Sequence, residues 1–182
     1  MMDNLAGCSW TGINTPGDLE TRSGVWVTKA GARNFPRGFV YSPESNSHWE
    51  WGAILEGGFE FDYKNRITKA LKGTSYIMAP DIALTAKPIG NPFLVWVEIT
   101  GPIASTAVEK CGGMLGELML SRFTGDQVKN VLRIAGLLHE HPIGYELQVH
   151  SRLWDFLAHA IHPRDGITKH VSAEIRKVLD YI

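Results

Sequence analysis

The chain has 182 residues, of which 44% are hydrophobic and 20% are charged, and 18 Lys and Arg stand against 19 Asp and Glu. This composition is typical of a globular protein, and the balanced charge gives no surplus of basic residues for binding a nucleic-acid backbone. The two cysteines, Cys8 and Cys111, are too few for a disulfide scaffold. The sequence has no signal-peptide start and no uncharged apolar stretch of membrane-spanning length, so we expect a cytoplasmic protein without membrane contact.

Up to about Gly101 the sequence is rich in Trp, Tyr, Phe, Val, Gly and Pro. Short apolar runs are separated by turn residues, for example at 56–58, 64–66 and 90–92, and this pattern is typical of short strands in a sandwich or barrel. The predicted strands are 24–29, 37–41, 48–55, 59–63, 74–79 and 93–99.

After Gly101 the apolar spacing becomes helical. Thr124 is a good N-cap for a helix over 124–140, and a second helix is predicted over 145–161, so the pair forms an αα-hairpin. A third amphipathic helix begins at Ser172, and because the chain stops inside it we expect a piece of a longer polypeptide. The predicted fold class is mainly β with C-terminal helices, a cupin-like jelly-roll β-barrel followed by an αα-hairpin.

A cupin barrel raises the question of a metal, which needs three or four nitrogen or oxygen ligands. Metal-binding cupins carry a His-x-His pair where this chain has Trp49-Glu50-Trp51, and Leu84 stands where a further histidine is expected. Six of the seven histidines lie in the helical half, between His139 and His170. We therefore predict no metal and no cofactor.

Aromatic side chains are the strongest candidates for a binding site. The two-residue period of a strand places Trp49 and Trp51 on one face and Glu50 on the other, and we expect the tryptophan face to point into the barrel. Trp96 and Glu98 also share a face, but both faces of that strand are mostly apolar. If they point inward, they can receive a polyhydroxylated or cationic small molecule; otherwise Trp96 is core and Glu98 lies in solvent.

Enzyme motifs are missing from the sequence. It has no Gly-x-Ser-x-Gly segment and no phosphate-binding glycine loop, and its glutamates are dispersed among the strands. We therefore expect a protein that is not an enzyme.

Three segments together resemble a known family: Ser42-Pro43 through His48-Trp49-Glu50-Trp51 to Gly57, Gly73-Thr74-Ser75-Tyr76-Ile77-Met78-Ala79-Pro80, and Phe93-Leu94-Val95-Trp96-Val97-Glu98-Ile99-Thr100-Gly101-Pro102. They resemble the N-terminal effector-binding and dimerisation domain of AraC/XylS-type transcriptional regulators. The segment 174–182 is similar to the opening of the helix-turn-helix domain that follows in such regulators.

The resemblance implies a bacterial sensor that binds a small effector in the barrel, forms a homodimer through its helices, and controls DNA binding by a C-terminal domain. It divides the chain into an N-terminal arm (1–21), an effector-binding barrel (22–102), a helical dimerisation segment (103–163), and a linker with the start of the DNA-binding domain (164–182). Trp96 matches the pocket tryptophan, and Ser42 and Arg33 match polar pocket positions of sugar-sensing members. Two further such positions hold Ala86 and Leu94, which disfavours an arabinose-like ligand.

The predicted ligand-binding residues are Trp96, Glu98, Ser42, Arg33, Trp49 and Trp51. The predicted dimer contacts are Leu147, His150, Leu153, Trp154, Leu157 and Ile161. The effector is expected to be a small organic molecule such as a sugar or a sugar derivative. For the helices, the alternative is that both pack wholly on the barrel.

Two other functions stay open. One is a stand-alone, metal-free cupin enzyme of the isomerase or epimerase type, using Glu98 with Tyr41 or Tyr76. The other is a carbohydrate-binding module whose tryptophans lie on the outer surface.

Overall fold

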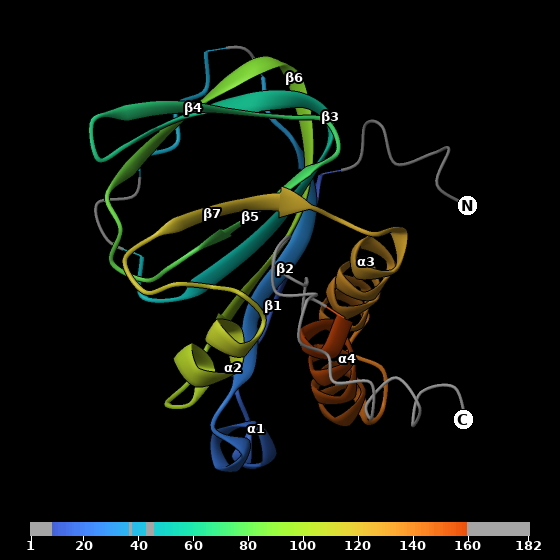
Figure 1. Cartoon of the computed structure of the whole chain (residues 1–182). Coiled ribbons are helices and arrows are strands. Elements are labelled where there is room, and N and C mark those ends of the chain that lie inside the picture. The colour runs from blue at the N-terminus through green and yellow to red at the C-terminus, as the bar shows by residue number, and fades with distance from the viewer. Residues whose placement is uncertain (1–8, 37, 43–45, 160–182) are drawn as a thin grey trace, which may run out of the picture.

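The computed structural model describes residues 9–36, 38–42 and 46–159, and the antiparallel sheet with C-terminal helices has the expected class (Figure 1). Seven strands form one sheet in the order β1-β2-β6-β3-β5-β7, with β4 paired to β3. The elements are β1 (Trp10–Ile13), α1 (Asp18–Ser23), β2 (Trp26–Asn34), β3 (Trp49–Tyr63), β4 (Arg66–Leu71), β5 (Thr74–Met78), β6 (Leu84–Thr100), α2 (Ala104–Lys110), β7 (Leu118–Arg122), α3 (Gly125–Glu140) and α4 (Tyr145–His159).

Two long strands, β3 and β6, bend at the same level and fold the sheet over on itself. The pairing shifts register around Glu56, between Ile54 and Gly58, and the β6 residues opposite are 89–93. Gly57 takes a φ of +61° there, which glycine adopts without the steric cost of a side chain. The turn residues at 56–58 and 90–92 therefore mark bends inside two continuous strands, and the prediction of strand ends at these places is wrong.

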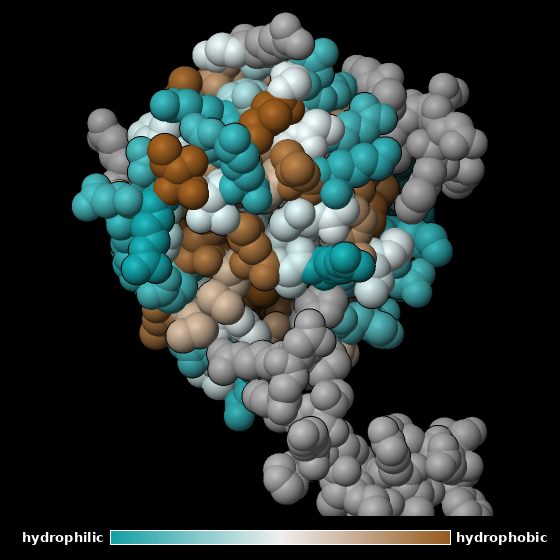
Figure 2. All heavy atoms as spheres, turned by 45° about the horizontal axis from the view of Figure 1, so that its top comes forward, coloured by the Kyte–Doolittle hydropathy of each residue, from teal (hydrophilic) through white to brown (hydrophobic). Residues whose placement is uncertain are grey.

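The β-turn between β3 and β4 agrees with the sequence. Lys64 and Asn65 both have positive φ, of 51° and 58°, as a two-residue hairpin between β3 and β4 requires. The prediction missed β4 itself, because its side chains are mostly exposed and its apolar residues do not alternate. Exposed Ile67 and Leu71 lie on it, and Figure 2 shows apolar residues on this side of the molecule interspersed with polar ones.

Helices α3 and α4 pack against the outer face of the sheet beside β1 and β2, while α2 lies near β3 and β6 (Figure 1). Thr124 caps α3 as predicted: its side chain accepts from the Gln127 backbone N–H, and Gln127 Oε1 accepts in return from the Thr124 N–H. Within the described part of the chain, no helix has the length and apolar character needed to cross a membrane.

The helix layer corrects the orientation of two tryptophans. Trp49 is 2% exposed and donates its indole N–H to Ser105 Oγ on α2 at 3.2 Å, and Trp51 is 4% exposed with its ring 5.1 Å from that of Phe156 on α4. Both therefore point away from the interior of the curled sheet. The helices bury this outer face of β3, so hydrophobicity alone could not show which face turned inward.

The same layer corrects part of the predicted dimer face. Leu153 (0% exposed) and Leu157 (4% exposed) are buried within the chain, where α4 meets α3 and the sheet, so they are not contacts between copies. Leu147 and Trp154 stay exposed at 64% and 42%, and half-buried His150 accepts the Trp154 indole N–H at 3.0 Å. Ile161 lies outside the described residues.

The predicted segment boundaries also change. The arm is not separate over 9–21, because β1 pairs with β2 and α1 follows it. The sheet does not end at residue 102, because β7 pairs with β5. Over 38–41, the described part of the strand predicted at 37–41, a single bridge between Tyr41 and Ala86 is present. The linker and third helix predicted after residue 163 lie outside the described residues.

Candidate ligand-binding cavity

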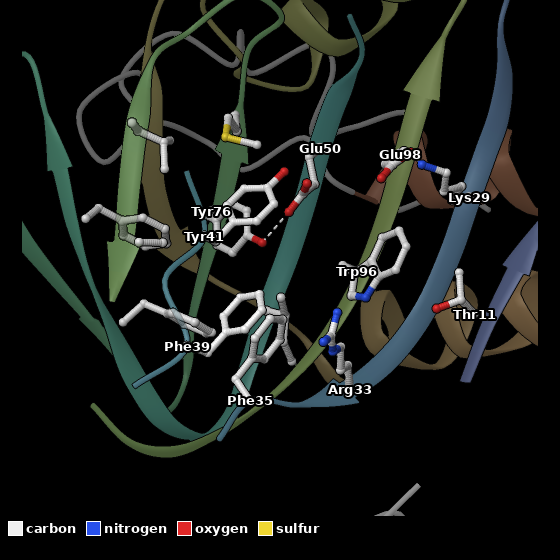
Figure 3. A pocket seen from close by; sticks show the side chains of 16 residues that line it. Thr11, Lys29, Arg33, Phe35, Phe39, Tyr41, Glu50, Tyr76, Trp96 and Glu98 are labelled. Atoms are coloured by element: carbon white, nitrogen blue, oxygen red, sulfur yellow. Dashed lines mark hydrogen bonds and ion pairs between the residues drawn. The ribbon is translucent and has the colours of Figure 1, made fainter. Parts of the chain in front are cut away.

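The inner face of the curled sheet lines a cavity of about 240 Å³ (Figure 3). Strand register sets which side chains reach it. Lys29, Glu98, Glu50 and Met78 form one row across β2, β6, β3 and β5, and Gly31, Trp96, Gly52 and Tyr76 form the next. Because side chains alternate along a strand, every second residue of each strand faces the cavity.

Gly52 in the second row makes room for the aromatic ring of Tyr76. A Cβ at Gly52 would overlap the Tyr76 ring, so only glycine lets that ring lie flat across β3. In this position the Tyr76 hydroxyl donates a short hydrogen bond to Glu50 Oε1. The local sequence at residue 52 thus positions a phenol against a buried carboxylate.

Charged groups concentrate at one end of the cavity. Glu98 Oε2 lies 3.4 Å from Lys29 Nζ and accepts from Thr28 Oγ1 at 3.3 Å, and Glu98 Oε1 lies 3.4 Å from His48 Nε2. Glu50 is directly opposite Glu98 in the β3–β6 pairing. His48, Glu50 and Glu98 place one ligand atom each within 4.8 Å of one another, which is the one such group among the described residues that could hold a metal ion.

The two carboxylates differ in their proton affinity. Burial raises the pKa of Glu50 from 4.5 to about 7, and the hydrogen bond from Tyr76 offsets only part of this rise. Burial also acts to raise the pKa of Glu98, but His48 and Lys29 beside it outweigh that effect and hold the pKa below its ordinary value. Glu98 is therefore ionised at neutral pH, while Glu50 takes up and releases a proton near it.

The rest of the cavity is aromatic and aliphatic. Its apolar lining comes from both halves of the curled sheet and from the 35–41 segment: Phe35, Phe39, Phe59, Phe61, Leu84, Ala86 and Leu94. Arg33 reaches the cavity from β2, and its guanidinium lies 5.1 Å from the ring centres of both Phe35 and Phe39. Tyr41 and Trp96 lie between this end and the carboxylates (Figure 3). The cavity thus offers an apolar wall, charged groups and hydroxyl groups within one small volume.

The structure brings together three of the six predicted ligand-binding residues. Trp96, Glu98 and Arg33 line the cavity, so the shared face of Trp96 and Glu98 turns inward. Trp49 and Trp51 lie on the opposite face of β3, against the helices. Ser42 is exposed outside the cavity.

The predicted set of ligand-binding residues missed His48 and Glu50, and Tyr76 was named only as a candidate residue of the enzyme alternative. The sequence does contain a signal for His48 and Glu50. They are two residues apart, so they share one face of the strand, and Trp49 and Trp51 lie on the opposite face. The comparison with a His-x-His pair was made on the wrong face of the strand. Tyr76 becomes a partner of Glu50 only through the pairing of β3 with β5, which no local pattern encodes.

No protein-family model and no curated protein matches the sequence. Solved structures do share the fold. The protein YhaK from Escherichia coli is 8% identical, with a TM-score of 0.50, and the match covers 67% of this chain and 54% of YhaK. Apo ToxT K231A from Vibrio cholerae is 10% identical, with a TM-score of 0.50, covering 81% of this chain and 55% of ToxT.

An RmlC-like cupin from Shewanella frigidimarina is 16% identical, with a TM-score of 0.35, covering 50% of this chain and 93% of that protein. The chain shares its fold, an antiparallel sheet with C-terminal helices, with YhaK and with ToxT, an AraC-family regulator. It spans about half the length of YhaK and ToxT (54% and 55%).

Proposed function

We propose that this chain is the effector-binding and dimerisation domain of an AraC-type transcriptional regulator, which binds a small organic molecule in the cavity and controls DNA binding by a C-terminal domain. The cavity carries this proposal, because a concave, mostly apolar site with a few converging polar groups is the usual form of a small-molecule site. The fold supports it, since the similarity to ToxT extends over 81% of the chain.

The lining favours an effector with two unlike parts. Glu50, Glu98 and the Tyr76 hydroxyl accept or donate hydrogen bonds at one end, where hydroxyl or cationic groups of a ligand fit. Phenylalanine and leucine side chains, together with Arg33, cover the other end. A sugar derivative that carries an apolar substituent meets both requirements better than an unsubstituted sugar does.

The position of the cavity suggests how binding is transmitted. Strands β2 and β6 line the cavity with one face and carry α3 on the other, so one pair of strands contacts both the ligand and the helix layer. An effector that favours one packing of the helices over another shifts the protein toward that state. The exposed Leu147 and Trp154 of α4 offer a face for pairing with a second copy.

The test is a thermal-shift screen of the full chain against sugars, sugar acids and their aryl and alkyl derivatives. A ligand that binds only the folded state raises the melting temperature. Hits are repeated with Trp96→Ala, which changes the cavity, and with Trp154→Ala, which makes the same change on the outer face of α4. A shift lost only in Trp96→Ala supports the proposal, whereas no hit, or a hit equal in both variants, contradicts it.

The enzyme alternative has one structural observation in its favour, the hydrogen bond between Tyr76 and Glu50 inside the cavity. Incubating each hit with the protein and analysing the products separates the two functions, because turnover contradicts a sensor without catalysis. The carbohydrate-binding module with outward tryptophans loses its basis, since Trp49 and Trp51 are buried and Trp96 lines the cavity.

A further inference from the structure

Three metal-ligating side chains converge at the charged end of the cavity, from two neighbouring strands. His48 directly precedes β3, and with Glu50 two residues further on it points to the same side of the strand. Glu98 on β6 is paired directly with Glu50. The backbone register of the sheet therefore holds the three groups together, with their ligand atoms all within 4.8 Å of one another.

One of the three side chains has a buried ring nitrogen that makes no full hydrogen bond. His48 Nε2 is buried and makes no hydrogen bond within the described part of the chain, and the nearest oxygen of Glu98 is 3.4 Å away. A buried nitrogen that is held by an ion pair at 3.4 Å, without a hydrogen bond, can take a further ligand. Two atoms bound to the same metal ion at about 2.1 Å lie about 3 to 4 Å apart, which matches this separation.

The facing carboxylates of Glu50 and Glu98 also favour a bound cation between them. Like charges directly opposite each other in a sheet repel, and burial between strands strengthens the repulsion. Lys29 is ion-paired with Glu98, but its Nζ lies beside Oε2, whereas His48 lies beside Oε1. The space between His48, Glu50 and Glu98 Oε1 thus has two acidic groups and an imidazole around it.

We propose that His48, Glu50 and Glu98 bind one divalent first-row transition metal ion of the Mn²⁺ to Zn²⁺ range. Imidazole nitrogen and carboxylate oxygen are the donors these ions prefer, and no thiolate is present among them to favour a soft ion such as Cu⁺. Three protein ligands leave coordination positions open toward the cavity. This site stands independently of the proposed sensor function, and it reverses the prediction of a metal-free barrel.

Lys29 provides a discriminating variant. Its side chain is 44% exposed and its charge lies beside Glu98, so it competes with a metal ion for that carboxylate. Lys29→Met removes the competing charge and keeps the apolar part of the side chain. The metal site therefore predicts tighter binding in this variant, an effect that a purely structural role of the three residues does not produce.

The experiment is calorimetric titration of the chelator-treated full chain with Mn²⁺ and with Zn²⁺. We expect one equivalent to bind, with affinity lowered by at least about tenfold in His48→Asn and in Glu98→Gln and raised severalfold in Lys29→Met. Two matched controls carry the same chemical changes on exposed residues, Glu56→Gln on β3 and His139→Asn on α3, and should bind as the original chain does.

Two outcomes overturn the proposal. One is no saturable binding of either ion to the original chain. The other is binding that His48→Asn and Glu98→Gln leave within twofold of the original, which places the ion elsewhere, for example on the helical histidines. Far-ultraviolet circular dichroism of each variant shows that it is folded, and the two single-site variants are independent, so the loss of one to misfolding leaves the other as the test.

Discussion

Replacing Glu50 by glutamine tests the electrostatics of the cavity directly. The side chain is 7% exposed, and burial raises its pKa from 4.5 to about 7. An acid whose pKa is higher in the folded state than in the unfolded state stabilises the fold fully below the unfolded pKa, and this contribution is lost as the pH rises through the folded pKa. The original chain should therefore lose stability between about pH 4.5 and pH 7.

The size of the effect follows from the shift. A rise from 4.5 to about 7 corresponds to up to about 3 kcal/mol of unfolding free energy lost above pH 7, at about 1.4 kcal/mol per pKa unit. Glutamine keeps the shape and still accepts the hydrogen bond from Tyr76, but it has no charge to bury. For a chain of this length the difference amounts to about 5 to 10 °C in melting temperature.

The assay is thermal unfolding followed by circular dichroism, in chelator, at half-unit steps from pH 5 to pH 8. Glu50→Gln should melt close to the original chain at pH 5 and about 5 to 10 °C above it at pH 8. Glu56→Gln, on the same strand but exposed, should follow the original chain at every pH. If the curves of Glu50→Gln and the original chain stay parallel from pH 5 to pH 8, the carboxyl at residue 50 is not held in a buried, charge-disfavouring site, and the reasoning is refuted.

Three further predictions concern the cavity, its wall and the helix layer. Trp96→Ala should weaken effector binding by at least about tenfold, measured by calorimetry on a screening hit, because the indole is a large part of the contact surface; unchanged affinity removes Trp96 from the site. Gly52→Ala should cost about 1 to 3 kcal/mol in urea unfolding because the added Cβ overlaps the Tyr76 ring. Gly136→Ala, in open space on α3, should instead stabilise by up to about 1 kcal/mol, and equal effects of the two changes would contradict the overlap. Leu157→Glu should destabilise the chain by several kcal/mol since the side chain is 4% exposed. Trp154→Glu should instead leave the melting temperature within about 2 °C and lower the mass measured by light scattering from dimer to monomer. An unchanged mass argues against pairing through α4.

The sequence by itself determined the class of the fold and the elements with strong local signals. The two-residue period and turn residues predicted most of the sheet before Gly101, and the capping pair at Thr124 and Gln127 fixes the start of α3 where the helical spacing begins. The paired Trp96 and Glu98 were also assigned to one face correctly, since that depends only on alternation along one strand. Such features are encoded within a few neighbouring residues.

Only the tertiary structure decided which face of each strand is inside. Both faces of β3 are buried, one by the cavity and one by α2 and α4, so the apolar pattern around Trp49, Glu50 and Trp51 had no polar side to set the direction. Likewise, the residues at 56–58 have the same local sequence pattern as the end of a strand. They form a bend inside β3 because β3 pairs with β6 on both sides of them.

The charged group of the cavity depends on the same long-range pairing. Glu98 lies about fifty residues after His48 and Glu50 in the sequence. The three side chains meet only because β3 and β6 are neighbouring strands with a fixed register. A shift of that register by a single residue would turn Glu98 to the opposite face, toward the helices. The residues that define the site were therefore visible in the sequence, but their meeting is a property of the sheet.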